Sequence, residues 1–201
     1  MPAARHHKLT VPDHQTLRKE AGRQVKDELG AIARPDDRFK RACEIVQQAD
    51  LEIAAHAEER NQAALSLWFY DGVRGLDKVL GMNSNAYSEM RRIALHGDKK
   101  ATINPGGDLN ARMTADERRA AAEEAGVPHT ENAADRLPSL ATTVSEANAR
   151  RKAALPFLQD AALVLTEEPY EWSTDRIAEF GDVTPKYARD AKNAAKRRRG
   201  H

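Results

Sequence analysis

The apolar residues of this chain recur mostly at every third or fourth position, the spacing that gives an α-helix one hydrophobic face. A first helix is expected after Asp13, which can cap it, and Gly30 with Pro35 should end it. A second, longer helix is expected from about Asp36. The apolar face of this second helix consists of Phe39, Cys43, Val46, Ala49 and Ile53. The second helix needs a partner, because an amphipathic helix is stabilised mainly by packing of its apolar face.

The middle of the chain is expected to contain short helices and one loop. Gly72, Gly75 and Gly81 separate three helical pieces in the most apolar part of the first half. Residues 98–113 contain a Pro-Gly-Gly sequence and indicate a loop, with a small hairpin over 101–111 as the one candidate for strands.

The second half of the chain returns to helical periodicity. Thr114 and Glu117 have the spacing of a capping box, and Gly126 should end the helix that they begin. The apolar residues of that helix are nearly all alanine, so we expect it to lie on the surface. Residues 138–166 form a further amphipathic pattern, in which Pro156 should break or kink the helix.

Two stretches follow the frame of a helix-turn-helix, which needs a short helix, a turn with a positive φ, and a second helix whose first side chains reach base edges. On that frame of twenty positions, the fourth, eighth, tenth, fifteenth and eighteenth are apolar, because they pack the two helices together. The fifth position is small, and the ninth favours glycine. The two stretches are Val73–Arg92 and Thr174–Asn193.

The first stretch has a complete apolar frame. Its five apolar positions hold Leu76, Leu80, Met82, Tyr87 and Met90. Gly81 takes the ninth position, and Asn83 can cap the second helix. Its departure from the frame is Asp77, which stands at the fifth position, where a small residue is expected.

The second stretch follows the frame with one shift at the turn. Its apolar positions hold Ile177, Val183, Ala188 and Ala191, and Ala178 fills the small one. Gly181 falls at the eighth position, and Asp182, a residue that tolerates a left-handed backbone, takes the ninth. We expect Thr184 to cap the second helix and Pro185 to begin it.

An apolar helix precedes each stretch and could complete a three-helix unit. The two stretches resemble the helix-turn-helix superfamily of bacterial DNA-binding regulators, and with their preceding helices they cover more than half of the chain. The resemblance implies binding of duplex DNA, with the second helix of each unit in the major groove, and no catalytic chemistry.

The expected fold is all-α, with two tri-helical helix-turn-helix units joined by a helical and loop linker. We expect an N-terminal helical arm over residues 1–35 and the first helix-turn-helix unit over 36–97. A linker with one surface helix should span 98–137, and the second unit, with a basic C-terminal tail, should span 138–201.

Charge is concentrated at the C-terminal end of the chain. The formal net charge is only +1, yet Lys186–Arg199 holds seven bases and a single acid, Asp190. Phosphate contacts act over roughly a Debye length, about 8 Å at physiological salt, so a local basic face is enough for nucleic-acid binding. The near-neutral total therefore does not exclude DNA as a partner.

Residues at the start of each second helix are expected to contact DNA. From the first unit these are Asn83, Ser84, Asn85, Ser88, Arg91 and Arg92. From the second unit they are Thr184, Lys186, Arg189 and Asn193. The residues expected to hold phosphates, which position the protein on the duplex, are Lys192, Lys196, Arg197 and Arg198.

Other chemistry has little support in the sequence. Cys43 is alone, so no disulfide forms within one chain, and the seven histidines show no metal-ligand spacing. No Gly-rich phosphate loop or nucleophile elbow occurs, so we expect no enzyme activity, metal or cofactor. No apolar run reaches the length of a membrane span. A cytoplasmic, nucleoid-associated protein without a membrane partner is expected.

The preferred function is sequence-specific binding of double-stranded DNA as a bacterial transcriptional regulator. An architectural or replicon-maintenance protein, such as a partition or end-binding factor, would use the same surfaces. A protein-interaction module that binds a transcription or replication partner is a further alternative. The first unit could also be purely structural, because its second helix carries mostly uncharged side chains. A homodimer stays open.

Overall fold

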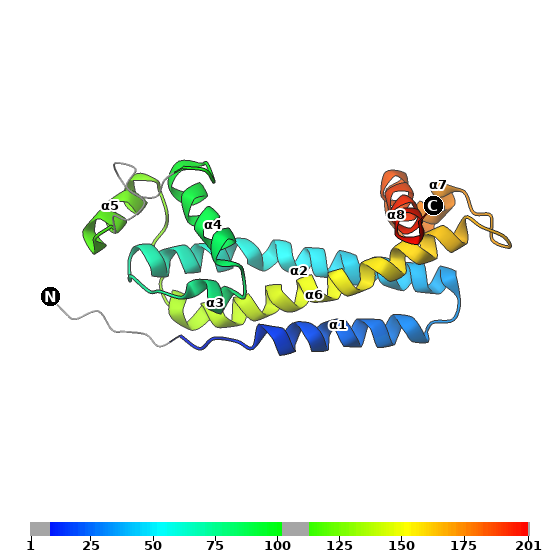
Figure 1. Ribbon diagram of the computed structural model, residues 1–201, viewed down its shortest axis with the longest axis horizontal. Helices are drawn as coiled ribbons and strands as arrows, with labels where there is room; N and C mark the ends of the chain where they lie inside the picture. Colours follow the sequence, from blue (N-terminus) through cyan, green and yellow to red (C-terminus); the bar gives the residue numbers. More distant parts are fainter. Residues whose placement is uncertain (1–8, 102–112, 201) are drawn as a thin grey trace. The chain divides into compact units, whose positions relative to one another are not determined.

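The computed structural model describes residues 9–101 and 113–200 (Figure 1). Every regular element within these ranges is an α-helix, which confirms the expected all-α class. The helices are α1 (His14–Ala31), α2 (Pro35–Phe69), α3 (Leu76–Leu80), α4 (Ser84–His96), α5 (Ala115–Glu124), α6 (Ala133–Leu165), α7 (Thr174–Phe180) and α8 (Pro185–Arg199). The hairpin considered over 101–111 lies, apart from Ala101, outside the described residues.

The helices form two compact units, each assembled from two separate stretches of the chain. Unit 1 comprises the described residues of Met1–His14 and Ala55–Val144, and unit 2 those of Gln15–Ala54 and Ser145–His201. Both α2 and α6 contribute residues to each unit. The division into an arm, two consecutive helix-turn-helix units and a linker stays a prediction.

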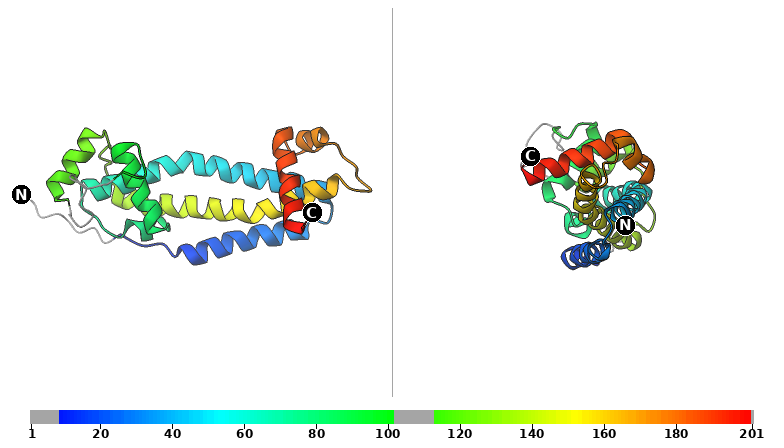
Figure 2. Two further views of the ribbon diagram at one scale, coloured as in Figure 1. Left: turned by 45° about the horizontal axis from the view of Figure 1, so that its top comes forward. Right: turned by 90° about the vertical axis from the view of Figure 1, so that its right-hand side faces the viewer.

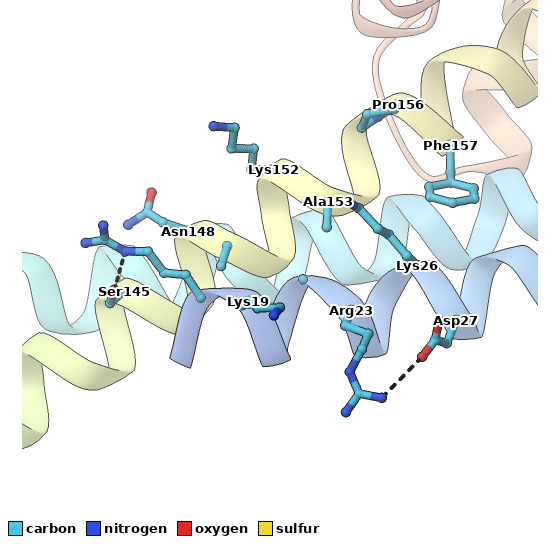
Figure 3. Close-up of a pocket in the computed structure, with 13 residues that line it drawn as sticks. Lys19, Arg23, Lys26, Asp27, Ser145, Asn148, Lys152, Ala153, Pro156 and Phe157 are labelled. Atoms are coloured by element: carbon cyan, nitrogen blue, oxygen red, sulfur yellow. Dashed lines mark hydrogen bonds and ion pairs between the residues drawn. The ribbon is translucent and has the colours of Figure 1, made fainter. Parts of the chain in front are cut away.

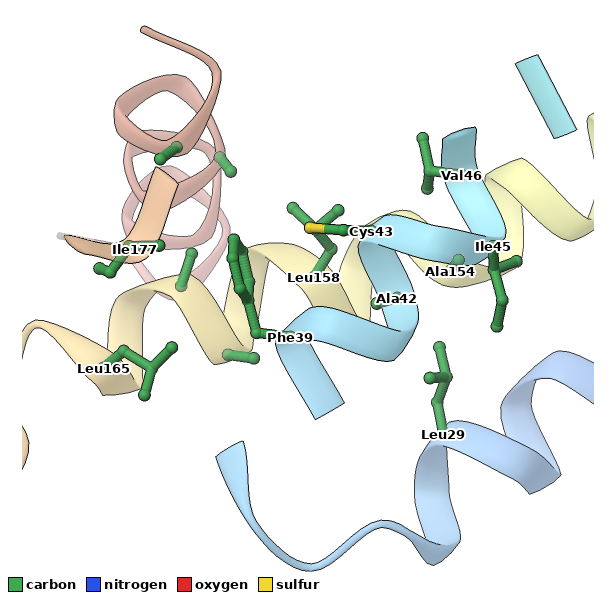
Figure 4. Packing of buried hydrophobic residues seen from close by; sticks show 14 of the residues in the cluster. Leu29, Phe39, Ala42, Cys43, Ile45, Val46, Ala154, Leu158, Leu165 and Ile177 are labelled. Carbon is green, nitrogen blue, oxygen red and sulfur yellow. The ribbon is translucent and has the colours of Figure 1, made fainter. Parts of the chain in front are cut away.

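The core of unit 2 is formed where α1 lies alongside the first part of α2 and the last part of α6, with α7 and α8 packed against them (Figure 2). Phe39 and Cys43 of α2 are buried against Leu158 of α6 and Ile177 of α7 (Figure 4). Burial of a large apolar side chain contributes roughly 1.5–3 kcal/mol to folding. Ile53, the last residue of the apolar face predicted for α2, is only half-buried.

The core of unit 1 lies beneath α3 and α4. Trp68 and Phe69, at the end of α2, pack with Leu76 and Leu80 of α3 and with Leu137 of α6. The two aromatic rings meet edge to face, with their centroids 4.5 Å apart, a favoured geometry for aromatic pairs. The last turns of α2 therefore serve unit 1, while its first turns serve unit 2.

The capping box predicted for α5 is present. Thr114 Oγ1 accepts a hydrogen bond from the backbone N–H of Glu117, and the Glu117 carboxylate accepts one from the backbone N–H of Thr114. The helix is mostly exposed, as expected, although Arg118 and Ala122 are buried. Local polar spacing was thus sufficient to place the start of this helix.

The break considered at Pro156 does not occur, because α6 runs without interruption from Ala133 to Leu165. Pro156 is exposed, whereas its neighbours Ala154 and Leu158 are fully buried in the core of unit 2. Packing of these neighbours offsets the loss of the one backbone hydrogen bond that a proline removes from a helix.

Candidate nucleic-acid interface

The turn between α7 and α8 has the backbone conformation that the sequence predicted. Asp182 adopts a left-handed backbone with a φ of 49°, and the Val183 N–H donates to the Ala178 carbonyl over 3.0 Å. Thr184 Oγ1 accepts a hydrogen bond from the Tyr187 N–H, which caps α8, and Pro185 is its first residue. Short polar signals therefore fix the direction in which α8 leaves the turn.

Gly181 is needed for space rather than for a left-handed backbone, since its φ is −92°. A Cβ at this position would meet the Phe39 ring and lie 3.0 Å from Cys43 Sγ. Gln47 Nε2 also donates to the Asp182 carbonyl over 2.8 Å. The turn thus sits directly on α2, through contacts that residues far away in the sequence provide.

The two faces of α8 differ sharply in chemistry. Its inner face is made of alanine, with Ala188, Ala191 and Ala195 buried. Its outer face carries exposed bases: Lys186, Arg189, Lys196 and Arg197. Lys192 and Asn193 are half-buried, and Asn193 lies on the side of Arg189 and Arg197, four residues from each. Because alanine side chains are small, α8 packs closely against the other helices of unit 2. Its cations face solvent.

The last turn of α8 is tied to α6. Arg198 Nη2 lies 2.8 Å from Asp160 Oδ1, and Arg199 Nη2 lies 3.4 Å from the same oxygen. Arg198 also donates to Gln159 Oε1 over 2.6 Å. Both arginine side chains are partly exposed, and ion pairs of this kind contribute only about 0–1 kcal/mol, so a phosphate can compete for them.

The helix pair α3–α4 packs through the residues predicted for its frame. Leu76, Leu80 and Tyr87 are buried, while Met82 and Met90 are half-buried against the same cluster. Gly81 has a left-handed φ of 61° at the turn. Asn83 Oδ1 accepts a hydrogen bond from the Asn85 N–H over 2.8 Å, which confirms the predicted cap of α4.

Asp77, the residue that departs from the frame, has a structural role. Its Oδ2 accepts a hydrogen bond from Ser84 Oγ over 2.7 Å, which links α3 to the first turn of α4. His14, which the sequence did not single out, is buried against Gly81, and its Nε2 lies 2.8 Å from the Val79 carbonyl oxygen. The Asp77–Ser84 and His14–Val79 contacts therefore stabilise the turn between α3 and α4.

The exposed face of α4 is polar but carries little free charge. Ser84 and Asn85 are exposed, whereas Ser88, Arg91 and Arg92 are half-buried. The Arg91 guanidinium lies over two rings of unit 1, 4.5 Å from the centroid of Trp68 and 4.8 Å from that of Tyr87. Burial lowers the pKa of Arg91, and the side chain also donates to Ser88 Oγ over 3.0 Å.

The structure therefore separates the predicted DNA contacts into two groups. Those on α8 share a face whose charged residues are all basic except the exposed Asp190, and among the described residues no ion pair engages Lys186, Arg189 or Arg197. Those on α4 are mainly uncharged, and Arg91 is turned toward the interior. The two groups lie in different units, Asn83 to Arg92 in unit 1 and Thr184 to Arg198 in unit 2.

No protein-family model, curated protein or solved structure matches this chain. In the part of the chain that the structure describes, no helix is both long enough and apolar enough to cross a membrane. Over residues 9–101 and 113–200, acidic, histidine and cysteine side chains do not gather into a group that could hold a metal ion.

Proposed function

We propose that this chain binds double-stranded DNA in a sequence-specific manner, with α8 inserted in the major groove. The observation that carries the proposal is the division of α8 into a buried alanine face and an exposed basic face, on a helix whose start is fixed by Thr184 and by the turn before it. In helix-turn-helix proteins, a rigid connection orients the second helix so that side chains from its first two helical turns contact the bases.

The side chains of α8 divide by position into base-reading and phosphate-binding groups. Lys186, Arg189 and Asn193 lie on the first turns or along one side of the helix, where side chains reach base edges. The phosphate-binding residues are Lys192, Lys196, Arg197 and Arg198. These cations would position the protein on the duplex without reading its sequence.

The helix pair α3–α4 would act as a second, weaker reader. Ser84 and Asn85 present hydroxyl and amide groups at the start of α4, which can bond to base edges. Arg91 lies over the rings of Trp68 and Tyr87, so α3–α4 has few basic side chains available to contact DNA. Two different readers on one chain would recognise an asymmetric or direct-repeat site, as a transcriptional regulator acting as a monomer does.

Binding-site selection from random duplexes, followed by titration against salt, tests this proposal. With the four phosphate contacts of α8, affinity for the selected site should fall by roughly 10² between about 50 and 200 mM salt. Lys186→Gln/Arg189→Gln should weaken binding strongly. Lys99→Gln/Lys100→Gln removes the same charge from an exposed turn of unit 1 and should change it little. A flat salt response, or equal effects of the two double variants, contradicts the proposal.

A further inference from the structure

A long groove runs between α1 and α6 in unit 2, with a volume of about 940 Å³ (Figure 3). Its floor consists of Gly22, Ala149, Ala153, Pro156 and Phe157. The residues of α6 that line it extend from Ser145 to Phe157, which corresponds to roughly 18 Å along a helix axis. The apolar floor itself extends on α6 from Ala149 to Phe157, roughly 12 Å or a little over two helical turns.

The rim of the groove is strongly basic. Arg18, Lys19, Arg23 and Lys26 line it from α1, Lys152 lines it from α6, and Asp27 is the one acid of the lining. These six side chains carry a formal charge of +4. The Arg23–Asp27 pair is 3.9 Å apart and largely exposed on both sides, so it neutralises little of this charge.

The apolar floor exists because small residues meet where α1 crosses α6. A Cβ placed on Gly22 would lie 3.8 Å from Cβ of Ala153, an ordinary van der Waals contact. The helices therefore approach closely at this point, and Arg18 of α1 donates to Ser145 Oγ of α6 over 2.8 Å at one end of the groove (Figure 3). An occupant with an apolar face and acidic flanks would meet complementary groups along its whole length.

We propose that this groove binds an amphipathic, acidic α-helix of a partner protein. An α-helix of about twelve residues spans the groove, its apolar residues at i, i+3, i+4 and i+7 would cover the floor, and its Asp and Glu side chains would reach the cations of the rim. Duplex DNA fits less well, because its surface offers phosphates but no apolar face for the floor. No residue of α8 lines the groove, although Arg198 of α8 donates to the Pro156 carbonyl at one end of it over 3.2 Å. If α8 binds DNA as proposed, a partner docked in the groove would be brought to that DNA.

A synthetic peptide and its scrambled counterpart test the proposal on the full chain. The peptide has fourteen residues, with leucine at helical spacing along one face and glutamate on the flanks, and the scrambled peptide has the same composition without that face. We expect saturable binding with a Kd below about 100 µM for the first, and binding at least about tenfold weaker for the second. Alanine methyl NMR signals of Ala149 and Ala153 should shift, while those of Ala188 and Ala191 stay in place.

Charge-reversal variants locate the site. Lys19→Glu/Lys152→Glu changes two exposed rim residues and should weaken peptide binding by about tenfold or more. Lys99→Glu/Lys100→Glu makes the same change in net charge on unit 1 and should alter it by less than about twofold. DNA binding through α8 should also be measured on both double variants. The two variants should differ less in their affinity for DNA than in their affinity for the peptide.

Three outcomes would overturn the proposal. One is no binding of the amphipathic peptide at concentrations up to about 1 mM. Another is binding that is equal for the two peptides, which would show charge attraction without use of the floor. The third is a shift of the Ala149 and Ala153 signals by duplex DNA, or by vesicles of anionic lipid, at lower concentrations than by the peptide.

Discussion

Gly181 and Phe39 touch so closely that a Cβ at position 181 would lie 2.5 Å from Cε1 of the phenylalanine ring. The next residue, Asp182, has the left-handed backbone of the turn. One glycine often provides both the small size and the positive φ of a turn, whereas here Gly181 provides the first and Asp182 the second. The contact seats the turn before α8 on α2, 142 positions earlier in the sequence. The direction of the basic face of α8 therefore depends on the packing of Phe39.

Replacing Gly181 with alanine should force α7 and α8 away from α2. We expect Gly181→Ala to lower the free energy of unfolding by about 1–3 kcal/mol, because the new methyl group overpacks the core. Gly30→Ala is the matched control, since a Cβ at position 30 of α1 would meet no atom within 4 Å. It should raise stability by about 0.5–1 kcal/mol. Denaturant titrations measure both, and equal stability of the two variants would contradict the close contact between Gly181 and Phe39.

Arg189 and the C-terminal tail should contribute to DNA binding in different ways. Arg189→Ala should cost about 1–3 kcal/mol at one or two base positions and relax specificity there. Deletion of residues 197–201 should weaken binding to all sequences alike and reduce the salt slope by roughly one per lost phosphate contact. Site selection with each variant distinguishes them. A selected motif altered by the tail deletion but not by Arg189→Ala would make the tail the reader.

Arg91 should matter for stability more than for recognition. Its guanidinium lies over the rings of Trp68 and Tyr87, and such contacts contribute roughly 0.5–2 kcal/mol each when desolvated. Arg91→Ala should therefore lower the thermal stability of unit 1 and leave the selected DNA motif unchanged. Glu89→Ala, at an exposed position of the same helix, is the control and should leave both nearly unchanged. A relaxed motif with unaltered stability would instead make Arg91 a base reader.

Asp36 should make stability depend on acid pH. Hydrogen bonds from the Arg34 guanidinium hold the pKa of the buried Asp36 carboxyl below its usual value of 3.8. A carboxyl with a lowered folded pKa adds stability above its unfolded pKa, and this stability is lost as the pH falls through the folded pKa. As the pH falls below about 5, the free energy of unfolding of Asp36→Asn should decrease less steeply than that of the unsubstituted protein. Asp27→Asn, at an exposed site, should leave the slope largely as it is.

Local features of this fold could be predicted from the sequence because each depends on neighbouring residues. The caps at Asn83, Thr114 and Thr184 and the left-handed Asp182 all involve partners within a few positions. The frame of the second stretch likewise identified Ala188 and Ala191 as buried, but not Ala195. These signals placed the starts of three helices and the turn before α8.

Other features depend on contacts between distant segments and left no local pattern. Arg91 has the spacing of a surface residue, and only the position of Trp68, in another helix, shows that it lies over an aromatic ring. The bases of α1 were not singled out, because a groove appears only when α6 lies beside that helix. Of the two outcomes expected at Pro156, the break does not occur, since packing of the adjacent residues keeps α6 continuous, and the kink stays a prediction.

The assembly of each unit from two stretches of chain has a consequence for biosynthesis. Chains leave the ribosome from their N-terminus, so Ala55–Val144 is complete before Ser145 is made. Unit 1 can therefore fold first, whereas Phe39 and Cys43 stay uncovered until Leu158 and Ile177 have emerged. A chain that stops before Leu158 would lack more than α7 and α8, because the apolar faces of α1 and α2 would also lose their cover from α6. Nascent chains arrested at that stage should be the form most exposed to chaperones and proteases.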